Sequence, residues 1–564
     1  MFRVALLLAA GVAAFAQQPA FPSKEGDFVA RDFTFHTGEK LAELRLHYTT
    51  VGEPRRDPDG KVRNAVVVMH GTGGTGRPFL GAGFGGELFG KGQPLDITKY
   101  YVILPDSVGH GRSSKPSDGL RAKFPHYNYE DMVHATHRLV TEGLGVGHLR
   151  LVMGTSMGAM HSWVYGYLYP DFMDALMPLA SAPVAIAGRN RMFRAMIMQA
   201  IKADPEYKDG EYTKPPLDGL VAAQYALWMM TSSPLQLTKT NATREQADAA
   251  VKALRERAAR VDANDMMYQY DSSSDYNPAP HLGKIRAPLF AVNSADDEVN
   301  PPELGFLERE IRNVARGRYI LIPTSDETRG HGTHTRAAVW KQHLTELMEL
   351  SEPLESSFSA ADLELSLDPK GPVWADAPRV IASRDYLNQP NPGPPTEIRS
   401  RWTKDHLYLF YSCPYDDLNL KPNPNRSAKT AELWNWDVAE AFIGWEYDHI
   451  GHYKEFQVSP QGEFIDLDIN REDPKAQQFM AWNSGMTVNA RIDSDAKIWY
   501  GVMRIPWRAI DTRTPEPGRE LRIGLYRIAG HDPNKKFYAW RPTGAKSFHV
   551  PKAFGTLRLT LPRP

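Results

Sequence analysis

The sequence predicts an α/β domain with a mostly parallel sheet and a helical lid, followed by an all-β sandwich domain. Continuous apolar runs alternate with helix-like segments over residues 25–350. The strand-like runs stop between about 183 and 280, and short aromatic strands separated by Gly, Pro and Asn turns fill residues 363–564. Strands that are apolar throughout are buried on both faces, which is typical of a parallel sheet covered by helices.

Five apolar runs are the expected strands of the first domain. They are NAVVVMH (64–70), YYVILPD (100–106), LRLVMG (149–154), PLFAVNS (288–294) and RYILIP (318–323). The helix-rich segment at 183–280 separates the first three runs from the last two. We expect such an insertion to lie over the carboxyl edge of the sheet, as a lid does.

The pattern of apolar runs and turn residues changes in the second half of the chain. A boundary is predicted near residue 355, with a linker at 351–362. The strands expected after it are shorter, as in HLYLFYS (406–412), EFIDLDIN (463–470), KIWYGVMRIP (497–506) and ELRIGLYRI (520–528). Short strands separated by frequent turns are typical of a β-sandwich.

The composition excludes several classes of partner. The chain has 564 residues, with 66 Lys and Arg against 67 Asp and Glu and a formal net charge of −1. Because there is no bulk positive charge, we expect no binding to nucleic acid or to an anionic membrane. The single cysteine, Cys413, excludes an intramolecular disulfide.

The N-terminus has the layout of a secretory signal peptide over residues 1–16. Arg3 gives a positive start, an apolar run follows, and Ala14-Phe15-Ala16 is a small-x-small cleavage site. The alternative is an N-terminal membrane anchor, but the run is short for a span of about 20 residues. We therefore expect a periplasmic or extracellular protein with no membrane span after cleavage.

A serine between two glycines follows the third strand run. Gly154-Thr155-Ser156-Met157-Gly158 has the Gly-x-Ser-x-Gly form, and apolar residues at helical spacing come after it. A sharp strand-to-helix turn leaves no room for side chains at the two glycines and exposes the serine hydroxyl over the sheet edge. The stretch therefore predicts Ser156 as a nucleophile.

The partners that such a serine requires stand downstream in the expected order. A serine hydroxyl needs a histidine to accept its proton and a carboxylate to orient that histidine, here in the chain order Ser, Asp, His. Asp296 and Asp297 follow the fourth run, and His331 and His334 lie in the loop after the fifth. We favour Asp297 and His331, although the spacing alone leaves both pairs open.

Two backbone amides are predicted to hold the oxyanion that forms when the serine attacks. One belongs to Met157, which follows the nucleophile, and the other to Thr72 in the HGTGG loop after the first strand. We expect no cofactor and no metal, because no accompanying ligand is evident beside His331 and His334 and the role of base explains His331 better.

Several stretches of the first half are typical of one family: GTSMGAMHSWVYGYLYPDFMDALMPLA at the serine, QAIKADPEYKDGEY and PPLDGLVAAQ in the lid, DEVNPPE at the aspartates and GHGTH at the histidines. By these stretches, residues 28–350 resemble the homoserine O-acetyltransferase-like branch of the α/β-hydrolase superfamily. The resemblance implies an α/β-hydrolase fold in which Ser156, Asp297 and His331 are nucleophile, acid and base. Transferases of this branch carry a longer glycine- and serine-rich signature where this chain has PDSVGHGRSSKPSDG. That departure favours hydrolysis.

Several stretches of the second half are typical of one family: LWNWDVAEAFIG, YKEFQVSPQGEFIDLDIN, MRIPWRAI, LRIGLYRIAG and YAWRPT followed by FHVPKAFGTLRL. By these stretches, residues from about 360 to 564 resemble a family 9-like carbohydrate-binding module. The resemblance implies a polysaccharide partner, and exposed rings among Trp434, Trp436 and Trp540 are the expected stacking platform. The alternative is that these tryptophans are core rings of the sandwich.

Together these features predict an exported serine hydrolase that cleaves an acyl ester, on a small molecule or a glycan, through an acyl-enzyme. Water is the available acceptor outside the cytosol. The alternative is a homoserine O-acetyltransferase-like acyltransferase that uses an activated donor. A third hypothesis is a binding protein whose hydrolase domain no longer turns over. The resemblance also implies a homodimer formed through the lid.

Overall fold

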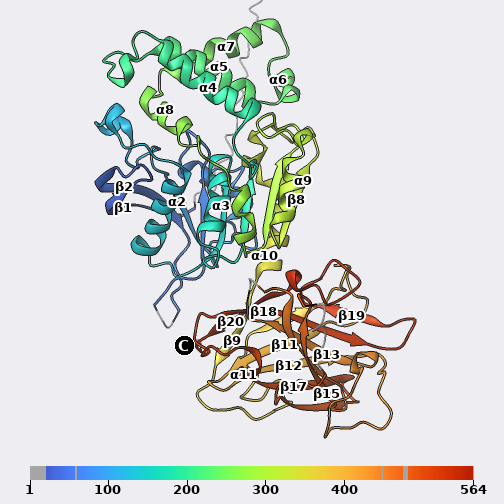
Figure 1. Ribbon diagram of the computed structural model, residues 1–564. Helices are drawn as coiled ribbons and strands as arrows, with labels where there is room; N and C mark the ends of the chain where they lie inside the picture. The colour runs from blue at the N-terminus through green and yellow to red at the C-terminus, as the bar shows by residue number, and fades with distance from the viewer. Residues whose placement is uncertain (1–20, 58–59, 447–448, 474–479, 563–564) are drawn as a thin grey trace, which may run out of the picture.

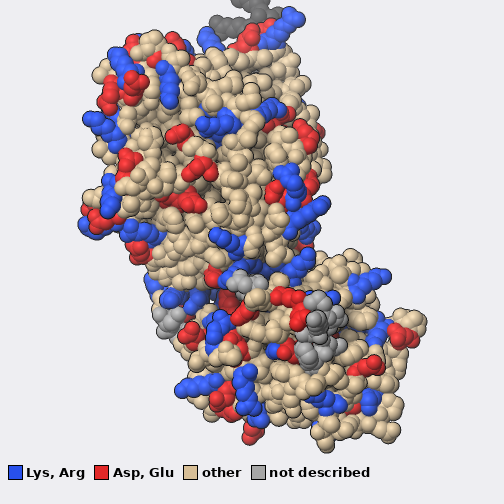
Figure 2. Space-filling model, in the orientation of Figure 1, with Lys and Arg blue, Asp and Glu red and all other residues tan. Residues whose placement is uncertain are grey.

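The computed structural model describes residues 21–57, 60–446, 449–473 and 480–562. The expected signal peptide at 1–16 lies outside the described residues. Two separate β-sheets organise the chain, one in each half (Figure 1). Within the described ranges, no helix has the length and apolar character that a membrane span requires. Lys, Arg, Asp and Glu are interspersed over the face drawn in Figure 2, in keeping with a net charge of −1.

The first sheet has eight strands in the order β1-β2-β4-β3-β5-β6-β7-β8. They are β1 Ser23–Thr34, β2 Lys40–Val51, β3 Ala65–Met69, β4 Tyr101–Pro105, β5 Leu149–Thr155, β6 Leu176–Leu179, β7 Leu289–Ser294 and β8 Gly317–Ile322. β2 pairs antiparallel with β1 and β4, and the remaining pairs are parallel. The predicted mostly parallel sheet is confirmed.

Helices cover both faces of this sheet. They are α1 Gly85–Leu88, α2 Tyr129–Arg138, α3 Met157–Leu168, α9 Phe306–Glu310 and α10 Ala337–Ser351. Successive residues of a strand point to opposite faces. On β3, Val67 and Met69 therefore join a core with α2 and α3, whereas Val66 and Val68 join a second core with α1 and α10.

Three strands of the sheet were not predicted. β1 and β2 form an antiparallel hairpin with many exposed positions, so they lack the continuous apolar runs of the central strands. β6 has only four residues and contains Pro178. Proline cannot donate a backbone hydrogen bond and normally argues against a central strand.

The predicted helical lid is confirmed between β6 and β7. Its helices are α4 Gly188–Ala203, α5 Leu217–Thr231, α6 Pro234–Thr240, α7 Arg244–Ala258 and α8 Ala263–Asp271. α4 to α7 form a layer at the end of the first domain that lies away from the second sheet, and α8 lies beneath them (Figure 1). The Gln269 side chain of α8 donates to the Gly109 carbonyl oxygen at 2.8 Å, which ties the lid to the loop after β4.

The second half of the chain is all-β, as predicted. Its sheet follows the path β15-β14-β13-β18-β20-β9-β11-β12-β17-β16, with β10 paired to β11 and β19 to β18. The strands are β9 Leu354–Phe358, β10 Arg379–Ala382, β11 Thr396–Trp402, β12 His406–Pro414, β13 Val438–Gly444, β14 His452–Val458, β15 Phe464–Asn470, β16 Thr487–Asp493, β17 Ile498–Pro506, β18 Glu520–Ala529, β19 Lys536–Ala539 and β20 Gly555–Thr560. Phe456 of β14 and Trp499 of β17 share one hydrophobic core. A single hydrogen-bonded sheet therefore folds over itself, where two separate sheets were expected.

The linker predicted at 351–362 contains a central strand instead. β9 begins three residues after the end of α10 and pairs in parallel with both β20 and β11. The polar residues of this segment indicated an exposed linker. However, Ser356 is buried, and its hydroxyl accepts a hydrogen bond from the Ser400 hydroxyl at 2.8 Å. The two domains consequently follow each other almost without a connecting segment.

Candidate active site

Ser156 lies in the tight turn between β5 and α3. Its backbone has φ 53° and ψ −112°, in a region that side chains rarely adopt. A Cβ added at Gly154 would clash with the carbonyl oxygen of Gly158, and one added at Gly158 would clash with that of Met69. The two glycines are therefore required by close backbone approaches, and the strained turn fixes the direction of the serine side chain.

We expect Gly158→Ala to lower the free energy of unfolding by about 2–3 kcal/mol, because the added methyl group meets backbone that cannot move aside. Thermal and urea denaturation measure the loss. Gly283→Ala is the matched control, since a Cβ there meets nothing within 4 Å. Equal stability of the two variants would contradict the close approach at Gly158.

His331 connects Ser156 to Asp297. Its Nε2 lies 2.8 Å from the Ser156 hydroxyl oxygen, and its Nδ1 lies 2.9 Å and 3.0 Å from the two carboxylate oxygens of Asp297. Asp297 follows β7 and His331 lies in the loop between β8 and α10. Of the two pairs that the spacing left open, the structure brings Asp297 and His331 to the serine.

The Asp297 carboxylate is fully buried and receives several hydrogen bonds. Val299 N donates to Oδ1 at 2.9 Å, and the Asn300 side chain donates to Oδ2 at 3.1 Å. Burial raises the pKa of Asp297, but the charge of His331 and the hydrogen bonds outweigh it, so the pKa lies below its ordinary value. A charged carboxylate accepts the Nδ1 proton of His331 and leaves Nε2 free to take the serine proton.

Asp296 and His334 support the site without touching the serine. Asp296 Oδ2 accepts hydrogen bonds from Thr328 Oγ1 and Gly330 N, both at 2.9 Å, and so holds the segment that precedes His331. The His334 ring stands edge-on to that of His331, with centroids 5.3 Å apart. Burial and the charge of His331 lower the pKa of His334 to about 3, so it packs as a neutral ring.

If the chain cleaves an acyl ester, as its sequence predicts, we expect Asp296→Ala to lower kcat by about 10- to 100-fold with little change in KM, because the segment before His331 loses its anchor. Steady-state kinetics measures both constants. Asp296→Asn keeps an acceptor oxygen and should recover most of the rate. If the Ala variant turns over at the wild-type rate, Asp296 does not position His331.

The glycine loop after β3 borders the serine. A Cβ at Gly71 would stand 3.3 Å from that of Ser156. His70 holds this loop, because its Nδ1 donates to the Gly71 carbonyl oxygen at 2.8 Å while its Nε2 accepts from Ser107 N at 3.0 Å. Burial lowers the pKa of His70, which favours the neutral ring that this pattern needs. The HGTGG motif predicts the loop, but nothing in the sequence indicates this role of His70.

The predicted oxyanion donors fit this arrangement. Met157 is the first residue of α3, so its amide has no acceptor within the helix. Thr72 follows Gly71 in the loop beside the serine. The amides of Met157 and Thr72 therefore stay our predicted donors to a developing oxyanion.

Comparison with known families decides the fold. A family model described as alpha/beta hydrolase fold matches residues 64–305. This first domain has the alpha/beta hydrolase fold. The matched range contains the strands β3 to β7, Ser156 and Asp297, and we call the first domain the hydrolase domain from here on.

The hydrolase domain has homoserine O-acetyltransferase-like relatives. A probable acyltransferase of Methanothermobacter thermautotrophicus is 28% identical over 278 residues, which cover 49% of this chain and 84% of that protein. A homoserine O-acetyltransferase of Haemophilus influenzae is 27% identical over 307 residues, with the same two coverages, 49% and 84%. An acetylester hydrolase of Corynebacterium glutamicum has a similar structure, with a TM-score of 0.52 and 20% identity over 58% of this chain and 96% of that one.

The tryptophans of the second domain do not form one exposed platform. Trp540 is only 6% exposed and belongs to the hydrophobic core, and the Arg541 guanidinium carbon lies 4.2 Å from its ring centroid. The prediction that Trp540 stacks on sugar is corrected, because its ring is already covered. Trp434 and Trp436 are half-buried, so their role in binding stays a prediction.

One cluster beyond the hydrolase site has the side chains of a metal site. It consists of His148, Asp174 and Glu520. However, Arg558 Nη2 lies among them, 3.0 Å from His148 Nε2, 2.7 Å from Glu520 Oε1 and in contact with Asp174 Oδ1. The guanidinium already supplies the positive charge, so the cluster is an ion-pair network between the hydrolase domain and β18 and β20.

Proposed function

We propose that the protein is a serine esterase that cleaves an acyl ester through an acyl-enzyme on Ser156. The observation that carries the proposal is the hydrogen-bonded series from the Ser156 hydroxyl through His331 to the buried Asp297 carboxylate. Relatives named as an acyltransferase and an acetylester hydrolase also support an enzyme that acts on acyl esters.

The geometry supports a two-step reaction. In the first step His331 Nε2 takes the proton of Ser156 as its oxygen attacks the ester carbonyl carbon, and the amides of Met157 and Thr72 stabilise the oxyanion. His331 then gives the proton to the leaving alcohol, and the acyl group stays on Ser156. In the second step His331 activates water, which releases the acid. Asp297 stabilises the imidazolium in both steps.

The acceptor in the second step distinguishes an esterase from an acyltransferase. The loop PDSVGHGRSSKPSDG after β4 lacks the longer glycine- and serine-rich signature of the transferases, which supports water as acceptor. The curated relatives named as transferases support the second candidate, acyl transfer from an activated donor. Export, and an ester carried on a sugar, belong to the proposal on the strength of the N-terminal sequence and the second domain.

The test is to incubate the purified chain with short-chain p-nitrophenyl esters, alone and with acetyl-CoA plus homoserine, while p-nitrophenol and acyl products are measured. A serine-reactive fluorophosphonate, followed by peptide mass spectrometry, reports the labelled residue. Ester turnover, labelling at Ser156 and no product that depends on acetyl-CoA are the expected results. Product formed only with acetyl-CoA would overturn the esterase proposal in favour of transfer.

A further inference from the structure

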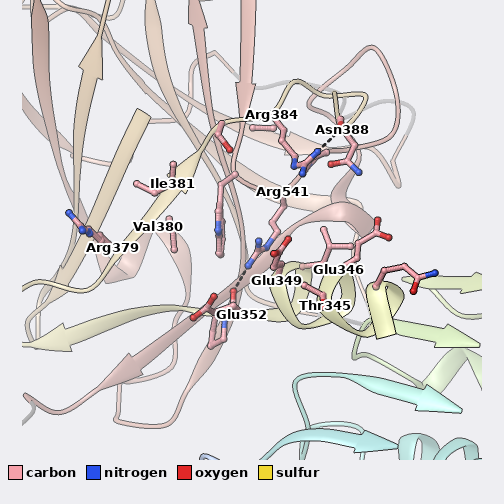
Figure 3. A pocket seen from close by; sticks show the side chains of 17 residues that line it. Thr345, Glu346, Glu349, Glu352, Arg379, Val380, Ile381, Arg384, Asn388 and Arg541 are labelled. Atoms are coloured by element: carbon pink, nitrogen blue, oxygen red, sulfur yellow. Dashed lines mark hydrogen bonds between the residues drawn. The ribbon is translucent and has the colours of Figure 1, made fainter. Parts of the chain in front are cut away.

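A cavity of about 630 Å³ lies where the two domains meet (Figure 3). One wall is the second half of α10, and the facing wall comes from β10, the segment that follows it and the stretch at 539–542. Ser156, Asp297 and His331 are not among the residues that line it. Its volume falls within the range typical of small-molecule sites.

The two walls carry opposite charges. Glu346, Glu349 and Glu352 line it from α10 and the residue after that helix, whereas Arg379, Arg384 and Arg541 line it from the second domain (Figure 3). Two of these groups are neutralised outside the cavity, since Glu346 pairs with Arg318 at 2.7 Å and Arg379 with Glu397 at 2.8 Å.

The remaining charged groups are available to a ligand. Arg384 donates to the Asn388 carbonyl oxygen at 3.1 Å, and Arg541 donates to that of Glu352. Among the described residues neither guanidinium has a carboxylate within ion-pair distance, and no cation lies within that distance of the Glu349 or the Glu352 carboxylate. The cavity wall thus presents unused donors on one side and an unused acceptor on the other.

Arg541 is the most constrained of these groups. It is 8% exposed, its guanidinium lies over the Trp540 ring, and its Nε has no partner among the described residues. Burial and the nearby charges of Arg150 and Arg316 outweigh the attraction of Glu352 and Glu349 and lower the pKa of Arg541 to about 9. Because its orientation is fixed and its donors are under-used, an acceptor brought by a ligand would stabilise it.

We propose that this cavity binds a neutral, hydroxyl-rich ligand, namely a saccharide of one or two rings. Neighbouring sugar hydroxyls both donate and accept, so they match guanidinium groups on one wall and a carboxylate on the other, with Thr345 and Asn388 beside them. Val380 and Ile381 offer apolar surface to the C–H groups of a sugar ring. The unpaired charges on the two walls have opposite signs. A ligand with a net charge would therefore be attracted by one wall and repelled by the other, which favours a neutral ligand.

The site is distinct from the proposed catalytic centre, so its test can be separated from catalysis. Isothermal titration of the full chain carrying Ser156→Ala measures binding without turnover. The probes are cellobiose and xylobiose, with galacturonate and inorganic phosphate as anionic comparators. We expect one of the disaccharides to bind to the Ser156→Ala chain. The wild-type chain should bind it with the same Kd, because neither disaccharide carries an ester that Ser156 could attack.

Substitutions in the cavity wall locate the binding. Glu349→Gln and Arg384→Met each remove one unused charge at an exposed position, and Ser383→Trp fills the space. We expect each to raise the Kd by about tenfold or more. Arg426→Met, an exposed arginine outside the cavity, is the matched control and should leave the Kd unchanged.

Three results would overturn the proposal. They are no heat of binding with either disaccharide, tighter binding of galacturonate or phosphate than of the sugars, and binding that survives Ser383→Trp. The last result would move sugar binding elsewhere, for example to Trp434 and Trp436. Circular dichroism and thermal unfolding check that each variant is folded. A loss of the heat of binding can then be attributed to the altered cavity and not to unfolding.

Discussion

Replacing Ser156 with alanine is expected to lower kcat/KM for a short-chain p-nitrophenyl ester by about 10⁴- to 10⁶-fold, because the proposed nucleophile is lost. The unfolding temperature should change little, since among the described residues the Ser156 hydroxyl forms a side-chain hydrogen bond with His331 alone. Steady-state kinetics and a thermal melt on the same preparation measure both effects.

The matched control is Ser274→Ala, which removes an exposed hydroxyl in the segment after α8. Its kinetics should equal those of the wild type. Residual hydrolysis by Ser156→Ala within tenfold of the wild-type rate would mean that another group attacks the ester. Loss of activity together with loss of folding would instead locate the role of Ser156 in the turn.

The second large effect is expected at Arg558, the cation of the network between the two domains. Its side chain is buried with Asp174, and it also contacts His148 and Glu520. Arg150 also lies 3.7 Å from Asp174, so Arg558→Met removes the closer of two arginine partners and leaves the buried carboxylate only partly compensated. We expect the free energy of unfolding to fall by about 3 kcal/mol. Urea denaturation measures the loss.

A double substitution separates the charge from the packing. Asp174→Asn combined with Arg558→Met removes both partners and should recover much of the stability lost in the single variant. Arg426→Met, at an exposed arginine, should be neutral. A double variant no more stable than Arg558→Met alone would show that the loss comes from packing rather than from an unpaired carboxylate.

The same network predicts how stability depends on pH. Burial raises the pKa of Asp174, but the charges of Arg558 and His148 outweigh it, so the folded-state pKa lies below its ordinary value. The stability that this group contributes is complete above the unfolded pKa of about 3.9 and is lost as the pH falls below it. Denaturation at acidic pH should show this loss in the wild type and a weaker loss in Asp174→Asn.

The sequence was sufficient to select Ser156, Asp297 and His331 as candidates, because each of them follows a recognisable strand. Ser156 follows β5, Asp297 follows β7 and His331 follows β8. Each of these strands coincides with an apolar run in the sequence. The choice within each pair of candidates required coordinates. Asp297 and Asp296 are adjacent in sequence, yet Asp297 contacts His331 and Asp296 anchors the segment before His331.

Other features could not be predicted because they depend on partners far away in the chain. β9 reads as a polar linker, and only pairing with β20 and β11 makes it a strand. Trp540 has the residue type of a sugar platform, and only the neighbouring core and Arg541 show that its ring is covered. No local sequence pattern indicates the cavity between the domains, because its two walls come from distant segments that meet only after folding.

The central position of β9 also governs how the second domain assembles. Ser356 of β9 accepts a hydrogen bond from Thr560 of β20, which lies 204 residues further along the chain. Loop-closure entropy makes such distant pairings slow to form. A nascent chain therefore exposes the β20-facing edge of β9 until β20 has been synthesised, while β11 and the hydrolase domain are already available to fold. Chaperone dependence and aggregation should accordingly be concentrated in the interval between the two strands.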